Sequence, residues 1–123
     1  DLIGREWISG FSLIFSELCP RLGDLITQDI PINDGIVQLF LETLSNHPDS
    51  LIARKNGVTV ARSVSQKASK VLDSGGIFTD RGRKDIKFFD VELATENGRL
   101  NPGTTADLCA AAIFLLLLTG FNP

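Results

Sequence analysis

The chain has 123 residues and a mass of 13.4 kDa, which limits it to one domain or to part of one. Hydrophobic residues make up 43% of the sequence, too large a share for an intrinsically disordered chain. Two cysteines and one histidine are too few for a disulfide framework, a cysteine-based zinc site or a histidine metal centre. The net charge of −3 argues against general nucleic-acid binding.

Charge is distributed unevenly along the sequence. Residues 1–53 hold two basic and eight acidic side chains, residues 54–87 hold nine and three, and residues 88–123 hold one and four. A basic middle segment suits a small anionic ligand better than a polyanion, although two solvated helix faces would give the same pattern. The longest apolar run, residues 108–118, is too short to cross a bilayer, and we find no signal peptide. We therefore expect a cytoplasmic protein without a membrane partner.

Apolar residues recur at helical spacing over most of the first half of the chain. Residues 3–22 form one stripe, and Pro20 is expected to kink or restart that helix. A loop is expected at 27–33, with Asn33 as N-cap of a second helix that ends before Pro48. A short helix at 50–56 and a third long helix, stopped by the glycines at 75–76, complete this half.

The second half continues the helical pattern. Thr79 is expected to cap a fourth helix that Gly98 stops, and residues 101–103 predict a turn. The last helix, from Thr104 to about Thr119, is apolar almost all round and is therefore expected to be buried. The sequence predicts an all-α fold: a bundle-like array of about five to six helices in one domain spanning 1–123, with the C-terminal helix buried.

The segment 101–107 is the first candidate for chemistry. Its Pro-Gly turn leads into the last helix, where free backbone N–H groups and the helix dipole suit a phosphate. Small side chains there let a ligand approach the backbone. Thr104 and Asp107 also have the spacing of a capping box, and Asp107 could both cap the helix and face a bound metal. Both interpretations stay open.

The segment 49–57 is the second candidate. Asp49 is a carboxylate of the kind that holds Mg²⁺, and it precedes two adjacent cations, Arg54 and Lys55, which suit phosphate oxygens. A solvated turn with a surface ion pair would use the same residues.

The other polar motifs indicate structure rather than chemistry. Residues 75–83 combine a helix stop, a helix start and solvated arginines, and His47 is expected at a helix end or on the surface. Cys19 and Cys109 lie among apolar residues, which predicts buried free thiols in a reducing compartment. We find no nucleophilic Ser/His/Asp or Cys/His set and no glycine-rich P-loop.

Two motifs together resemble one known family. The segment Asp-Ser-Leu-Ile-Ala-Arg-Lys-Asn-Gly at 49–57, with Asn-Pro-Gly-Thr-Thr-Ala-Asp-Leu at 101–108, resembles the triphosphoribosyl-dephospho-CoA synthase family, archaeal-type members above all. The likeness covers nearly the whole chain. It implies an all-α transferase that joins ATP to dephospho-CoA and releases adenine, with Mg²⁺ as the cofactor.

The resemblance also implies roles for particular residues. Asp49 and Asp107 would be the catalytic carboxylates, holding Mg²⁺ or acting as general base. Arg54 and Lys55 would neutralise phosphate charge. The turn after Pro102 would bind a phosphate through the backbone of Gly103, Thr104 and Thr105. We expect Asp107 to share a cleft with Asp49 and at least one of the two cations.

The chain also departs from this family. Bacterial members tend to read Asp-Thr-Asn where this chain has Asp49-Ser50-Leu51, and a leucine binds neither metal nor phosphate. The family's N-terminal motifs are absent and the chain opens at Asp1, so we expect the C-terminal half of a longer protein, incapable of turnover alone. The missing half, a second chain or a homo-oligomer would cover apolar faces of the first and last helices. The alternatives are a non-catalytic helical module that binds a nucleotide or a partner helix, and the same fold acting on another cofactor precursor.

Overall fold

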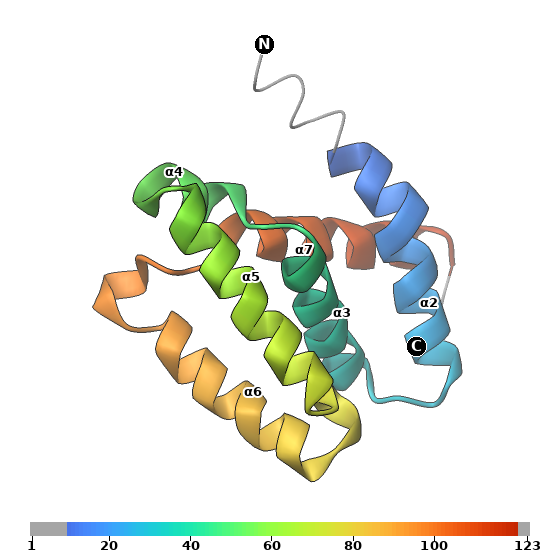
Figure 1. The fold of residues 1–123 in the computed structure, drawn as a ribbon. Helices are drawn as coiled ribbons and strands as arrows, with labels where there is room; N and C mark the ends of the chain where they lie inside the picture. Colours follow the sequence, from blue (N-terminus) through green and yellow to red (C-terminus); the bar gives the residue numbers. More distant parts are fainter. Residues whose placement is uncertain (1–9, 121–123) are drawn as a thin grey trace. The chain divides into compact units, whose positions relative to one another are not determined.

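The computed structural model describes residues 10–120, and every regular element in that range is helical (Figure 1). The all-α prediction is therefore confirmed. The elements are, in chain order, the π-helical turn η1 (Ile14–Leu18), α2 (Cys19–Thr27), α3 (Ile32–Asn46), α4 (Ser50–Asn56), α5 (Val58–Asp73), the 3₁₀ turn η2 (Gly76–Phe78), α6 (Asp80–Leu93), the 3₁₀ turn η3 (Glu96–Gly98) and α7 (Gly103–Leu118).

The chain divides into two compact units. The first contains the described residues up to Leu39 and those from Asp107 onward, and the second is Phe40–Ala106. The boundaries fall inside α3 and α7.

Pro20 shapes the first unit as the sequence predicted. Proline has no N–H and its ring clashes with the carbonyl four residues earlier, so an α-helix cannot run through it undisturbed. Just before the proline the chain forms the π turn η1, in which the Cys19 N–H donates to the Ile14 carbonyl. Helix α2 then begins at Cys19. Ile14, Leu18 and Leu22 of the predicted stripe are buried, and so is Leu25 beyond its end, whereas Phe11 of the stripe is exposed. The predicted stripe positions 3 and 7 lie outside the described residues.

The prediction that the last helix is buried is met only in its first part. Cys109 and Ala112 of α7 are buried, but Phe114, Leu117 and Leu118 are 52–66% exposed. Helical spacing identifies apolar positions but does not say what covers them. Phe11 and Phe15, whose rings stack 6.5 Å apart, are exposed as well. The apolar surface expected on the first and last helices is therefore present.

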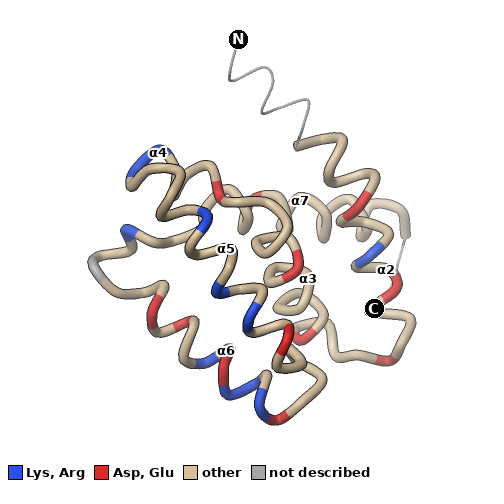
Figure 2. Tube along the Cα trace, viewed as in Figure 1, with Lys and Arg blue, Asp and Glu red and all other residues tan. Residues whose placement is uncertain are grey.

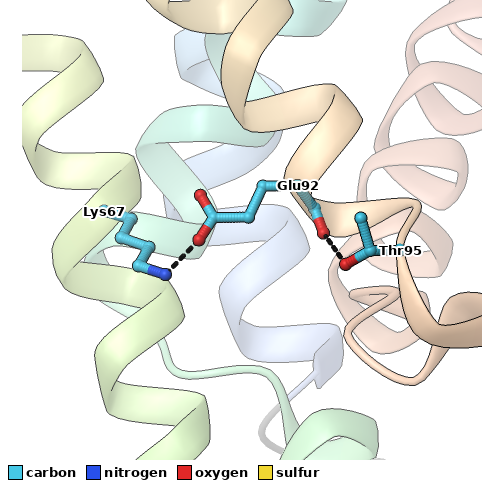
Figure 3. A network of polar contacts seen from close by, with 3 residues as sticks. All are labelled: Lys67, Glu92 and Thr95. Carbon is cyan, nitrogen blue, oxygen red and sulfur yellow. Dashed lines mark hydrogen bonds and ion pairs between the residues drawn. The ribbon is translucent and has the colours of Figure 1, made fainter.

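The second unit is built around α5, which packs against α4 and α6 (Figure 1). Its core joins the end of α3 to α4, α5 and α6 through Leu41, Leu44, Ile52, Ala61, Val64, Ala68, Val71 and Phe89. An ion pair between Lys67 and Glu92 links α5 to the end of α6 (Figure 3). The Thr95 hydroxyl donates to the Glu92 carbonyl at 2.7 Å and so adds a hydrogen bond where α6 ends.

Several helix ends lie where the sequence placed them. Gly57, with φ of +96°, closes α4, and the Thr79 hydroxyl accepts the Gly82 N–H at 2.9 Å at the start of α6. Gly75 and Gly76 both have positive φ, so the structural interpretation of residues 75–83 holds. A Cβ placed on Gly82 would lie 2.1 Å from the Gly76 carbonyl oxygen, so this turn packs directly on the helix.

Three boundaries were predicted wrongly. Helix α3 begins at Ile32, because the Pro31 carbonyl already accepts the Gly35 N–H at 3.0 Å, and Asn33 is therefore inside the helix. Helix α6 ends at Leu93 rather than at Gly98. Helix α7 begins at Gly103, one residue before the predicted start. Within residues 10–120, no helix is long and apolar enough to cross a membrane.

Candidate functional site

Asp49 joins the starts of two helices. It immediately precedes α4, and its Oδ1 accepts the N–H groups of Leu51 and Ile52 at 2.9 and 3.0 Å. Its Oδ2 accepts the backbone N–H and the hydroxyl of Thr105, both at 2.7 Å. Asp49 is therefore the N-cap of α4 and at the same time a cap for the first turn of α7.

Asp49 is buried, so its carboxylate depends on these hydrogen bonds. The residue is 2% exposed, so the alternative of a solvated turn is wrong for it. A buried carboxylate is tolerated only when its oxygens are hydrogen-bonded, and two helix N-termini supply both the donors and a favourable dipole. Its two oxygens have about four acceptor positions, and four donors use them. A metal or base role for Asp49 would require one of these bonds to be given up.

The backbone predicted to bind a phosphate is packed against the protein itself. Besides the two Thr105 donors, the Thr104 hydroxyl pairs with the Ser50 hydroxyl at 2.8 Å. A Cβ placed on Gly103 would lie 2.6 Å from Leu51 Cδ2, so the Leu51 side chain fills the space beside this glycine. The predicted capping box is also replaced: Thr104 is the second residue of α7, and Asp49 caps the helix from another segment. A phosphate at residues 103–105 stays a prediction.

The two cations of the candidate site lie at the opposite end of α4 from Asp49. Arg54 and Lys55 are exposed in its last turn, about 8–9 Å along the axis from Asp49, where positive charge is favourable to the helix dipole. They belong to the basic part of the chain, which Figure 2 shows as blue segments along α4, α5 and α6.

Asp107 is exposed on α7 and belongs to the first unit. A cleft shared with Asp49, Arg54 and Lys55, which lie in the second unit, stays a prediction. Among residues 10–120, no group of three or more His, Cys, Asp or Glu side chains is placed to hold a metal. Mg²⁺ commonly takes only one or two protein carboxylates together with substrate phosphates, so an exposed carboxylate such as Asp107 fits that use.

A pocket in the second unit was not predicted from the sequence. It has a volume of 390 Å³ and lies where the end of α6 meets the segment before α7. Its described lining is Phe40, Asp90, Leu93, Ala94, Gly98, Asn101 and Pro102. Asn101 and Pro102 belong to the motif that the sequence singled out, but nothing local in the sequence indicates that Phe40 and Asp90 meet them.

The cysteines are free thiols, as predicted, and Cys109 is buried. Cys19 is only partly buried, but burial still raises the pKa of its thiol. Its Sγ donates to the Ala112 carbonyl at 3.7 Å. His47 directly follows α3, at a helix end as expected. None of these groups lines the pocket described above.

Comparison with known proteins decides the family. The CitG family, described as ATP:dephospho-CoA triphosphoribosyl transferase, matches residues 1–122. The chain belongs to this family. It is 28% identical over 107 residues to the 2-(5''-triphosphoribosyl)-3'-dephosphocoenzyme-A synthase of Klebsiella pneumoniae, a match that covers 87% of this chain and 35% of that protein. A probable synthase of the same name from Pseudomonas fluorescens is 29% identical over 111 residues, covering 90% of this chain and 38% of that protein.

The chain therefore spans little more than a third of the length of these CitG relatives. No solved structure matches it.

Proposed function

We propose that this chain is part of a transferase that converts ATP and dephospho-CoA into triphosphoribosyl-dephospho-CoA and adenine. The observation that carries the proposal is the CitG match over residues 1–122, supported by curated relatives that bear the synthase name. The all-helical structure of residues 10–120 agrees with the fold that the resemblance implied.

In the proposed reaction, a ribose hydroxyl of the acceptor attacks C1′ of ATP. The new O–C1′ bond forms as the bond from C1′ to adenine N9 breaks, and the hydroxyl proton passes to a carboxylate while adenine takes up a proton on leaving. Such a step needs a base beside the hydroxyl and cations along the triphosphate. Mg²⁺, held by carboxylate and phosphate oxygens, would supply part of that positive charge.

The residues of this chain divide between binding and positioning in this proposal. Arg54 and Lys55, both exposed, neutralise phosphate charge. Asp107, also exposed, holds Mg²⁺ or accepts the proton. The sequence also assigned Asp49 to Mg²⁺ or base chemistry and residues 103–105 to phosphate binding. The hydrogen bonds from Thr105 to Asp49 favour a positioning role for Asp49, because they fix the start of α7.

The test uses the longer protein that contains this chain. Adenine release from ATP is measured with dephospho-CoA and with a panel of other cofactor precursors as acceptors. Release that depends on dephospho-CoA supports the proposal, and release with a different acceptor only would replace the substrate while keeping the reaction. A protein that binds nucleotide but releases no adenine with any acceptor would be the non-catalytic module.

Asp107→Asn tests the assignment of the carboxylate. The substitution keeps the shape and removes the charge, so Mg²⁺-dependent ATP binding should weaken tenfold or more, about 1.4 kcal/mol. Asp24→Asn, an exposed carboxylate on α2, is the matched control and should leave binding unchanged. Unchanged Mg-ATP binding in a folded Asp107→Asn variant would remove Asp107 from the site.

A further inference from the structure

The pocket at the end of α6 has a lining suited to a small organic ligand. Its 390 Å³ lies within the range of about 300–1,000 Å³ that is common for ligand pockets. Phe40 offers an aromatic ring, and Leu93, Ala94 and Pro102 add apolar surface. Asp90 and Asn101 add a carboxylate and a carboxamide. This combination of apolar surface and a few polar groups is typical of sites that orient a flat, partly polar molecule.

The side chains of Asp90 and Asn101 can form hydrogen bonds to a ligand in this pocket. Asp90 and Asn101 are exposed, and within the part of the chain that the structure describes neither side chain has a hydrogen-bond partner. An ionised carboxylate only accepts hydrogen bonds, whereas a carboxamide both donates and accepts. Together they match a ligand edge that presents an N–H donor beside a ring nitrogen acceptor.

The charge of the lining excludes one class of ligand. Asp90 is the one ionisable side chain among the described lining residues, and none of them is a cation. A phosphate or carboxylate group would be repelled by Asp90 and would find no positive partner there. The ligand group is therefore neutral or cationic, and the aromatic ring and apolar surface favour a flat heteroaromatic group.

We propose that this pocket binds an amino-substituted heteroaromatic base of the adenine type. The base would stack on Phe40, its amino group would donate to Asp90, and its ring nitrogen would accept from Asn101. Base stacking on an aromatic side chain and hydrogen bonds to the base edge are the general means by which proteins hold such rings.

The walls of the pocket are held in place by an ion pair on one side and by backbone hydrogen bonds on the other. The Lys67–Glu92 ion pair fixes the last turn of α6, which carries Asp90 and Leu93, to α5 (Figure 3). On the other side, the Asn101 N–H donates to the Gly98 carbonyl at 3.0 Å, and the Gly103 N–H donates to the Asn101 carbonyl at 2.9 Å. The pocket lining thus continues directly into the start of α7.

This inference rests on the proposed function for its biological source, because ATP and dephospho-CoA each carry an adenine. The shared chemistry is the base, and competition distinguishes the two sources. The pocket itself lies within one compact unit, so binding of the free base can be tested on the 123-residue chain without turnover.

The experiment is calorimetric titration of the chain with adenine and with hypoxanthine, which has a carbonyl oxygen in place of the amino group. We expect adenine to bind at least fivefold more tightly than hypoxanthine. Asp90→Ala should weaken adenine binding about tenfold, the cost of a hydrogen bond to a charged group, and Asp90→Asn should weaken it less. Phe40→Leu keeps an apolar side chain but removes the stacking ring, and should also weaken binding about tenfold.

Asp85→Ala is the matched control, because it removes another carboxylate of α6 that does not line this pocket. Binding equal to wild type is expected for this variant. Adenine that does not bind, or that binds equally well to wild type, Asp90→Ala and Phe40→Leu, would overturn the proposal. Since Phe40 packs against the core, thermal unfolding is measured for each variant, and Asp90→Ala decides the outcome if Phe40→Leu does not fold.

Competition then identifies the source of the base. Displacement of adenine by ATP alone assigns the pocket to the base of ATP, and displacement by dephospho-CoA alone assigns it to the acceptor. Displacement by neither would contradict the proposal. If adenine binds at this pocket but the longer protein releases no adenine, the proposed function is refuted and the pocket assignment stands. If the longer protein releases adenine but adenine does not bind at the pocket, the pocket assignment is refuted and the proposed function stands.

Discussion

Asp49 and Thr105 are joined twice, because one carboxylate oxygen accepts both the backbone N–H and the hydroxyl of Thr105 at 2.7 Å. The other oxygen of the same carboxylate caps α4. A single buried side chain therefore fixes the starting points of two helices, both of which carry residues assigned to the candidate site.

Asp49→Ala should lower the free energy of unfolding by about 3 kcal/mol or more. Four donors lose their acceptor, and a buried donor without a partner costs about 1–3 kcal/mol. Asp49→Asn should cost less, because its amide oxygen can still cap α4 while its NH₂ group faces the Thr105 donors. Urea denaturation measures both, with Asp85→Ala as a control expected within about 0.5 kcal/mol of wild type.

Thr105→Val should cost about 1–2 kcal/mol, since it removes the hydroxyl hydrogen bond but keeps the shape of the side chain and the backbone N–H. Thr105→Ser keeps the hydroxyl and should cost less. In a double-mutant cycle with Asp49→Ala, the two substitutions should be coupled by about 1 kcal/mol. Strictly additive effects would show that the contact contributes nothing to stability.

The sequence predicted those parts of the fold that depend on neighbouring residues. The bounds of α4 match the predicted short helix at 50–56, which the following glycine, Gly57, closes. Thr79 caps α6 at the predicted helix start. The hydrogen bonds between Asp49 and Thr105 join residues 56 positions apart. A local sequence pattern cannot predict that a carboxylate will cap the start of so distant a helix.

The same reason explains what was missed at the candidate site. Leu51 filling the space at Gly103 and Phe40 meeting Asn101 in one pocket both depend on how distant segments pack. The exposed end of α7 is a related case. Its apolar residues led us to predict burial, but the sequence does not show which surface would cover them.

Cys19 should make the unfolding free energy depend on pH in the alkaline range. Burial raises the pKa of its thiol above the ordinary value of 9.0, so above that pH the unfolded chain binds fewer protons at this site than the folded chain. The contribution is fully present below about pH 9 and is lost as the pH rises through the folded-state pKa. Cys19→Ala should lack this decline, which urea denaturation between pH 7 and 10 would measure.

The same shift predicts the reactivity of the thiol. The thiolate is the nucleophile, so at pH 8 iodoacetamide should alkylate Cys19 more slowly in the folded chain than in urea. Peptide mapping distinguishes it from Cys109. Equal rates at Cys19 in the two states would contradict the effect of burial.

Gly82→Ala should destabilise the protein by about 2–4 kcal/mol, although alanine is the better helix former. The new Cβ would lie 2.1 Å from the Gly76 carbonyl oxygen and 2.4 Å from the Gly76 nitrogen, and backbone atoms cannot move aside as the end of a side chain can. Gly23→Ala is the matched control in α2, where a Cβ meets nothing within 4 Å. Without a clash the change from glycine should stabilise by about 0.5–1 kcal/mol. Denaturant titrations measure the change in the free energy of unfolding for both variants. Changes of opposite sign would verify the close packing of α6 on the glycine turn at 75–76, whereas an increase for both variants would show that α6 starts farther from that turn.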